Sequence, residues 1–221
     1  MIPPDHNAEF VYHMEDVLAL YHEPYDPAYP MVCFDETSKQ LIKETRLPIP
    51  AQPGRVKRYD YEYERNGVRN LFLFFEPLAG RRRVKVTERR TKKEWAECMK
   101  ELVDELYPTA KKVRVVLDNL NTHNPAALYE FYSPIEARRI LGKLDFHYTP
   151  KHGSWLNMAE IEFSVLVRQC LNRRIPDEGV LRREVNAWES ERNANASRVK
   201  WQFTTEDARI KLERLYPSFD Q

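Results

Sequence analysis

The chain has 221 residues, and its 35 Lys and Arg residues against 34 Asp and Glu residues give a formal net charge of +1. A hydrophobic content of 42% is too high for a disordered chain, and the length fits one large domain or two small ones. Three scattered cysteines exclude a disulfide framework, and we find neither a signal peptide nor a membrane-spanning run. We therefore expect a cytoplasmic protein whose balanced charge gives no overall sign of nucleic-acid binding.

The first part of the chain is predicted to form a helix followed by strands. Apolar residues at helical spacing indicate a helix over Asn7–Tyr21, and a proline-rich linker follows it. Met31–Asp35 is a short apolar run of the kind that forms a buried strand ending in acids. Asp60–Glu64 is typical of a short extended segment. Asn70–Phe75 and Arg83–Thr87 flank a glycine-containing turn, which predicts a hairpin.

The rest of the chain alternates between helices and strands. A capping box at Thr91 and Glu94 predicts a helix over Thr91–Tyr107, and Lys112–Asp118 is a second buried strand that ends in aspartate. The later predicted elements are a helical stretch Pro125–Leu141 with a break at Ser133–Pro134, a strand Leu144–Thr149, and helices Leu156–Leu171, Gly179–Ala194 and Thr205–Leu215. This order predicts an α/β fold in which an antiparallel meander precedes βα units.

Two of the predicted strands end in aspartate, at Asp35 and Asp118. If the strands are neighbours in one sheet, both carboxylates reach the same edge. Carboxylates together with substrate phosphates are typical ligands of Mg²⁺, and two such ions can stabilise the attacking and leaving oxygens of a phosphodiester. The residues alone leave a simpler interpretation open, in which each aspartate is a strand-end cap or turn residue.

A third carboxylate is expected from the helix that follows Gly153. On a regular helix, Glu160 falls at the margin of the apolar arc, where a carboxylate needs a partner or a metal ion. Glu162 falls on the more polar side, so we expect a solvated surface charge there. The helical face therefore favours Glu160 as the third acid.

These acids lie in three motifs, Val32–Glu36, Leu117–His123 and Tyr148–Glu160. Together the motifs resemble the catalytic domain of mariner-like bacterial insertion-sequence transposases, which belong to the DDE superfamily of endonucleases. The resemblance extends from about Ile2 to Asp177. It implies that Asp35, Asp118 and Glu160 form a catalytic triad that binds Mg²⁺ or Mn²⁺, as two ions. One departure is the stretch between Asp118 and Glu160, which is longer than usual in the superfamily.

The resemblance also implies a fold and a domain organisation. We expect an α/β, RNase H-like fold whose mixed sheet combines an antiparallel three-strand meander with parallel strands and is flanked by helices. Residues 1–30 would form an N-terminal helix and proline-rich linker, residues 31–176 the catalytic domain, and residues 177–221 a C-terminal helical extension. The surplus residues before Glu160 are expected in a helical segment at Ser133–Lys143.

The activity implied by the resemblance is metal-dependent cleavage of DNA at the ends of an insertion sequence, followed by strand transfer. The expected partners are DNA and a second copy of the chain, with no membrane, in the bacterial cytoplasm near the nucleoid. Helix-turn-helix modules that recognise element ends are expected to be separate or missing. Two alternatives are a truncated, non-mobile copy that only binds DNA or dimerises, and another RNase H-like nuclease.

Basic residues provide candidate DNA contacts. The run Arg81–Lys93 holds eight basic residues and one acid, and strand alternation places two of its cations on one face. Such a face can bind phosphates or can simply be a solvated surface. A cation and an aromatic also flank the Glu160 helix, although core packing is an alternative for Trp155. The predicted DNA contacts are Arg81, Arg82, Arg83, Lys85, Lys151, His152 and Trp155.

Three further polar residues are candidate auxiliary groups: Asn119, His123 and Asn157. His123 follows Asp118 closely and can contact a phosphate or a triad neighbour, or can be a structural residue. Capping is the favoured role for Asn157. The arginines of the C-terminal part are balanced by glutamates, so we expect ordinary helix-surface charge at Arg182, Arg183, Arg192 and Arg198.

Overall fold

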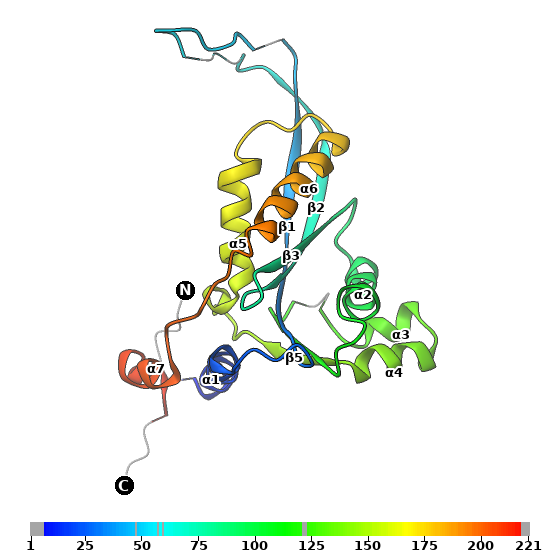
Figure 1. Cartoon of the computed structure of the whole chain (residues 1–221), viewed down its shortest axis with the longest axis vertical. Coiled ribbons are helices and arrows are strands. Elements are labelled where there is room, and N and C mark those ends of the chain that lie inside the picture. Colours follow the sequence, from blue (N-terminus) through cyan, green and yellow to red (C-terminus); the bar gives the residue numbers. More distant parts are fainter. Residues whose placement is uncertain (1–6, 47, 57, 59, 121–122, 218–221) are drawn as a thin grey trace.

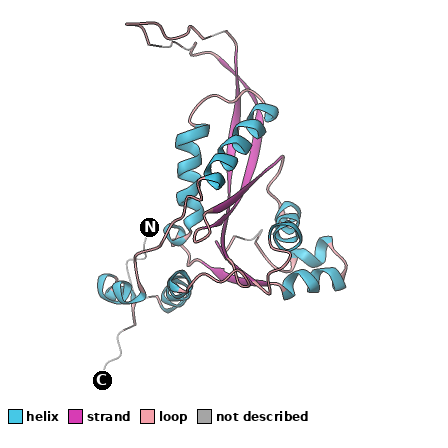
Figure 2. Ribbon diagram, in the orientation of Figure 1, coloured by secondary structure: helices cyan, strands magenta, loops and turns pink. Residues whose placement is uncertain are grey.

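The computed structural model describes residues 7–46, 48–56, 58, 60–120 and 123–217. At its centre is a five-stranded mixed sheet with helices on both faces (Figures 1 and 2). The strand order is β3-β2-β1-β4-β5, in which β1, β2 and β3 are antiparallel while β1, β4 and β5 are parallel. The strands are β1 Met31–Glu44, β2 Tyr63–Glu76, β3 Arg81–Thr87, β4 Val113–Leu117 and β5 Leu144–Tyr148. The expected meander followed by parallel strands is confirmed.

The helices begin and end close to the predicted positions. Asn7 and Thr91 cap the first two, and the predicted break at Ser133 separates α3 from α4. The α-helices are α1 Ala8–His22, α2 Lys92–Glu101, α3 Ala127–Phe131, α4 Pro134–Gly142, α5 Met158–Leu166, α6 Glu178–Ala194 and α7 Thr205–Lys211. Single π-helical turns extend α2 over Leu102–Leu106 and α5 over Val167–Leu171, and 3₁₀ turns cover Ser154–Leu156 and Glu213–Leu215. None of the helices in the described part of the chain is long and apolar enough to cross a membrane.

Strands β1 and β2 extend further than predicted. Their antiparallel pairing runs from Cys33 opposite Phe75 to Glu44 opposite Tyr63, with a bulge between Gln40 and Ile42. Figure 1 shows this ribbon projecting beyond the body of the protein. The outer halves are mostly polar and show no regular apolar alternation, although Leu41 is buried in the core. The ladder of hydrogen bonds between the two strands stabilises them, together with a hydrogen bond from the Ile42 backbone N–H to the Ile175 carbonyl.

The sheet separates two hydrophobic cores, and the alternation of side chains along β1 determines in which core each of its residues lies. Cys33 belongs to the core formed with α1, α5 and α6, whereas Phe34 belongs to the core formed with α2, α3 and α4. Because side chains alternate along a strand, Asp35 follows Cys33 toward α5, and Glu36 follows Phe34 toward α2. The two adjacent acids therefore leave β1 on opposite faces of the sheet.

Helix α6 protects the exposed edge of the sheet at β3. The Asn193 side chain accepts from the Arg82 backbone N–H and donates to its carbonyl, both at 2.8 Å. Glu189 accepts from the Val84 backbone N–H at 2.8 Å. These contacts satisfy backbone groups that would otherwise offer a template for aggregation. The division into residues 1–30, 31–176 and 177–221 stays a prediction. Helix α6, which belongs to the last of these segments, packs on the sheet at β3.

A buried ion cluster corrects three predictions. Glu162 is only 1% exposed and contacts Arg82 Nε at 2.8 Å and Arg192 Nη2 at 3.1 Å, so it is not a solvated surface charge. Arg82 is 3% exposed and also donates to the carbonyls of Gly80 and Ser197, so its guanidinium cannot reach DNA. Arg192 is a partner of this cluster rather than ordinary surface charge. The cluster joins β3, α5 and α6.

We predict that Glu162→Ala lowers the free energy of unfolding by about 3–5 kcal/mol, because it leaves two guanidinium groups without their shared carboxylate. Thermal unfolding measures this loss. Glu206→Ala is the control, since Glu206 is an exposed acid on α7 that lies outside both the cluster and the pocket lined by the three predicted catalytic acids. Equal melting temperatures for Glu162→Ala and wild type would show that the buried cluster contributes nothing to stability.

Candidate active site

The structure brings Asp35, Asp118 and Glu160 to one pocket of about 550 Å³. Asp35 lies on β1, Asp118 directly follows β4, and Glu160 lies in the first turn of α5. Strands β1 and β4 are parallel neighbours in which Cys33 lies opposite Val116, so two residues later both aspartates reach the same level. The expectation that the two aspartates lie side by side is therefore met, although β1 does not end at Asp35 as predicted but continues to Glu44. Helix α5 adds the third acid to the pocket.

The three carboxylates form an electrostatically strained group. The pKa of Asp35 is raised to about 7, first by burial and then by the negative charges of Asp118, Glu36 and Glu160. The backbone N–H of Glu36, which donates to Asp35 at 2.8 Å, opposes this rise. An acid whose charge is disfavoured by burial and by neighbouring acids is stabilised in its charged form by a cation.

The donor set fits a hard divalent cation. Four acids line the pocket, Asp35, Glu36, Asp118 and Glu160, and all offer the oxygen ligands that Mg²⁺ and Mn²⁺ prefer. We call it the three-carboxylate pocket after Asp35, Asp118 and Glu160. Among the residues that the structure describes, no three His, Cys, Asp or Glu side chains converge closely enough to chelate an ion as they stand. The acids therefore line the walls of a cavity, and ligation would require their side chains to move inward.

Asn157 ties the helix that carries Glu160 to the strand that carries Asp35. Its side chain is 1% exposed, donates to the Phe34 carbonyl at 2.9 Å and accepts from the Ala159 backbone N–H at 3.1 Å. The second bond caps α5, so the predicted capping role is confirmed. The first bond grips β1 one residue before Asp35. The distance between the two elements is thus set next to the site.

His123 holds Asp118 from the opposite face of the sheet. It is 2% exposed, its Nδ1 lies 2.6 Å from Asp118 Oδ1, and its Nε2 lies 2.8 Å from Glu36 Oε2. Burial lowers the pKa of His123, but the two carboxylates outweigh burial and raise it to about 10. Because its ring is buried between Asp118 and Glu36, His123 contacts one of the three predicted acids rather than a phosphate. Residues 121 and 122 of the same motif lie outside the described part of the chain.

Glu36 was missed by the sequence analysis, although alternation along β1 was a usable signal. It lies next to Asp35 but points to the other face, where it meets His123. Arg90 and Arg168 were missed as well, and both line the three-carboxylate pocket. Nothing in the local sequence marks these arginines, because their position depends on how the loop before α2 and the end of α5 pack around the pocket.

Asn119, Lys151 and His152 lie on the other side of Asp118. With Asp118 they line a second cavity of about 630 Å³, and all three are exposed. Their position beside a candidate catalytic acid is compatible with phosphate contacts, which stay a prediction. The Trp155 ring instead stacks on Trp201 at a centroid distance of 6.3 Å, as the core-packing alternative expects.

The basic strand face is largely neutralised. Val84 and Val86 point inward as predicted, and Arg83 and Lys85 lie on the opposite face of β3. However, Lys85 contacts Glu101 at 2.9 Å, and Arg83 contacts Glu101 at 3.4 Å. Together with the burial of Arg82, these ion pairs leave less positive charge for DNA than the sequence suggests. The exposed Arg81 stays a predicted contact.

Comparisons with known proteins agree with this geometry. The family model described as DDE superfamily endonuclease matches residues 30–182, which include Asp35, Asp118 and Glu160. No curated protein matches the chain.

Similar solved structures include a Mos1 transposase paired-end complex with left transposon end (TM-score 0.58, 13% identity, 89% of this chain and 60% of that chain). They also include a Mos1 Strand Transfer Complex, with a TM-score of 0.57 and 11% identity over 89% of this chain and 60% of that chain. A third is a Mos1 mariner paired end complex with Mn, with a TM-score of 0.56 and 13% identity over 89% of this chain and 61% of that chain. The chain thus spans about 60% of the length of these structures. Their likeness confirms the expected fold.

We predict that Asp35→Asn stabilises the metal-free chain in a pH-dependent manner. The pKa of Asp35 is about 7 in the folded chain against an ordinary value of 3.8, so wild-type stability falls as pH rises from about 4 to about 7. Asparagine cannot ionise, so Asp35→Asn abolishes this loss of stability at higher pH. Because the site is partly solvated, we expect a gain of about 1–2 kcal/mol at pH 8 and a smaller gain at pH 5.

Urea unfolding in EDTA at the two pH values measures this difference. A gain of equal size at pH 5 and pH 8, or no gain at pH 8, would contradict the electrostatic account of the pocket.

Proposed function

The chain belongs to the DDE superfamily of endonucleases, and we propose that it is a mariner-like DNA transposase catalytic domain. In this proposal Asp35, Asp118 and Glu160 hold Mg²⁺ or Mn²⁺, as two ions, and the chain cleaves and rejoins DNA strands. The observation that carries the proposal is the three-carboxylate pocket, built from two neighbouring parallel strands and the first turn of a helix. The fold shared with Mos1 transposase complexes supports it.

The metal ions, when bound, would activate the attacking oxygen and stabilise charge on the leaving oxygen. The role of the three acids is to hold these ions beside the scissile phosphate. Two reactions fit such a site: water attacks phosphorus and frees a 3′-hydroxyl, and this hydroxyl then attacks a phosphodiester of target DNA. Each attack breaks one phosphorus–oxygen bond as it forms another, and a proton passes from the attacking to the leaving oxygen.

The surrounding residues orient the acids. The imidazolium of His123 contacts Asp118 at 2.6 Å and so restrains its carboxylate. Asn157 sets the helix of Glu160 against the strand of Asp35. We assign both as positioning residues, since neither lines the three-carboxylate pocket.

The proposed substrate is double-stranded DNA, at element ends and at a target. A similar solved structure is described as a paired-end complex, which supports pairing of two ends by two copies of this chain. We also propose that the chain forms a homodimer, that its helix-turn-helix modules are separate or missing, and that it is located near the bacterial nucleoid.

We predict that Asp118→Ala and Glu160→Ala each lower Mn²⁺-dependent strand cleavage by about 100-fold or more, because each removes a metal ligand. Cleavage of a labelled plasmid or end-sequence duplex measures the loss. Glu206→Ala is the matched control, since Glu206 is an exposed acid on α7 far along the chain from the pocket.

Wild-type activity in both triad variants would refute the assigned triad. Cleavage that prefers RNA–DNA hybrids over duplex DNA would instead support another RNase H-like nuclease.

A further inference from the structure

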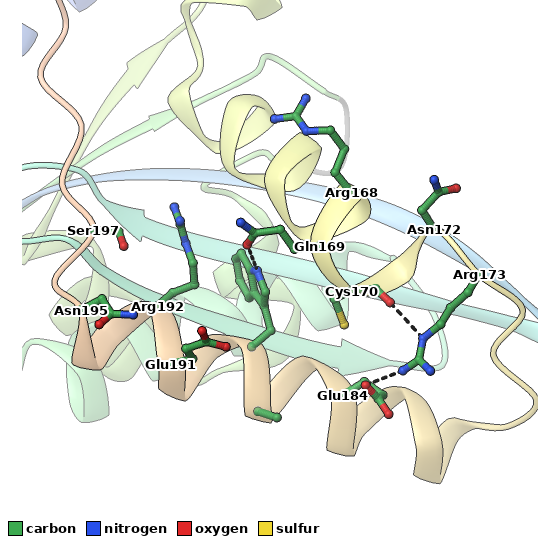
Figure 3. Close-up of a pocket in the computed structure, with 12 residues that line it drawn as sticks. Arg168, Gln169, Cys170, Asn172, Arg173, Glu184, Glu191, Arg192, Asn195 and Ser197 are labelled. Atoms are coloured by element: carbon green, nitrogen blue, oxygen red, sulfur yellow. Dashed lines mark hydrogen bonds and ion pairs between the residues drawn. The ribbon is translucent and has the colours of Figure 1, made fainter. Parts of the chain in front are cut away.

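One arginine belongs to two cavities. Glu160, Ser164 and Arg168 lie at intervals of four residues along α5 and its π-helical turn, and all three line the three-carboxylate pocket. Arg168 also lines a second polar cavity of about 550 Å³, between the end of α5 and α6 (Figure 3). The α5–α6 cavity, as we call it, is therefore adjacent to the carboxylate pocket, with Arg168 at the junction.

Arg168 differs from the other arginines of the α5–α6 cavity in its contacts. Arg173 is paired with Glu184, and Arg192 is paired with Glu162. None of the ion pairs found among the described residues includes Arg168. Its Nη1 donates to Ser164 Oγ at 2.8 Å, which holds the guanidinium toward the Glu160 end of the helix. The group keeps its other donors for an anion outside the chain.

The carboxylate pocket needs such a cation if it binds DNA. Its acids repel the phosphates that approach it, and metal ions offset this repulsion only at the scissile position. An arginine at the pocket rim can bind the next phosphates along the strand and fix the register of the substrate. Arg90 also lines the carboxylate pocket, but of these two arginines only Arg168 also lines the α5–α6 cavity.

We propose that Arg168 binds a backbone phosphate of the DNA strand leaving the carboxylate pocket, and that this strand continues into the α5–α6 cavity. The proposal rests on the proposed function for the identity of the polymer. Eight residues of helix separate Glu160 from Arg168, a rise of about 12 Å, and one strand carries a phosphate about every 3.4 Å of axis. Arg168 therefore contacts a phosphate about two to four nucleotides from the scissile one.

The cavity beyond Arg168 has a polar lining that includes amides and arginines as well as the carboxylates of Glu184 and Glu191. Asn172 and Asn195 supply amides at two ends of this lining, one just after the π-helical turn and one just after α6 (Figure 3). Side-chain amides are common partners of phosphate oxygens. Arg168 acts here as a positioning residue, because it holds the substrate rather than the reacting atoms.

The first test compares Arg168→Gln with Arg183→Gln. Arg183 is an exposed arginine of α6 that lines neither cavity. Binding of a fluorescent duplex is followed by anisotropy in EDTA over a series of salt concentrations, so no strand is cut. We expect Arg168→Gln to weaken binding about 5- to 10-fold and to reduce the slope of log K against log salt by about 0.9, the value for one phosphate contact. Arg183→Gln should change neither quantity.

The second test places a negative charge in the proposed path. Asn172→Asp puts a carboxylate into the α5–α6 cavity, whereas Asn186→Asp puts one on the exposed face of α6. The net charge changes equally, so a larger loss of affinity in Asn172→Asp reports a strand that runs through the cavity. Equal losses in the two variants would overturn the proposed path.

Wild-type affinity and salt slope in Arg168→Gln would overturn the phosphate contact, as would a wild-type chain that does not bind duplex DNA. These binding outcomes are separate from the cleavage outcomes. If Asp118→Ala still cleaves DNA, the proposed triad fails, while the affinity of Arg168→Gln still decides the role of Arg168.

Discussion

Three carboxylates in one pocket repel one another, and this repulsion is the constraint on which the rest of the structure depends. At Asp35 this repulsion adds to the effect of burial, which is the larger cause, and together they raise the pKa of Asp35 to about 7. A chain free to relax would separate these charges. The fold prevents this by building two of the acids into adjacent parallel strands and the third into a helix that is bonded to one of them.

The contacts that hold the three acids together against their repulsion are made by neighbouring residues and not by the acids with one another. Asn157 bridges the Phe34 carbonyl and the first turn of α5, so β1 and the helix cannot drift apart. His123 brings a positive charge to Asp118. Glu162, two residues beyond Glu160, is paired with the buried Arg82 and the half-buried Arg192, and these pairs connect α5 to β3 and α6. Helix α5 thus carries the exposed Glu160 in the carboxylate pocket and, on another face, the buried Glu162, which stabilises the fold.

Much of the fold could be predicted, because its helices and inner strands carry local signals. Capping residues marked α1 and α2, and apolar runs marked the inner half of β1 and all of β4. The outer halves of β1 and β2 could not be predicted, since polar strands are stabilised by each other and not by an apolar pattern. Asp35, Asp118 and Glu160 could be predicted as a group, because each lies next to a recognisable pattern: Asp35 and Asp118 directly follow apolar strand runs, and Glu160 lies in the first turn of a capped helix.

Charge pairs between distant segments could not be predicted. A helical wheel takes the apolar arc as the buried side, but α5 is also covered by α6, whose Arg192 makes burial of Glu162 favourable. In the same way, Arg82 belongs to a basic run that suggests an exposed strip, yet the strand turns it onto Glu162. The balanced net charge of +1 thus conceals an uneven distribution, with several basic residues consumed by internal pairs.

The most direct test of the central claim is an electron paramagnetic resonance titration of the chain with Mn²⁺ at pH 7.5, in which bound ions lose the free-ion signal. The account predicts saturable binding by wild type that is lost in a variant carrying both Asp35→Asn and Asp118→Asn, while Glu206→Gln binds as wild type does. Equal Mn²⁺ binding by the double variant and wild type would contradict the claim that these carboxylates form the metal site.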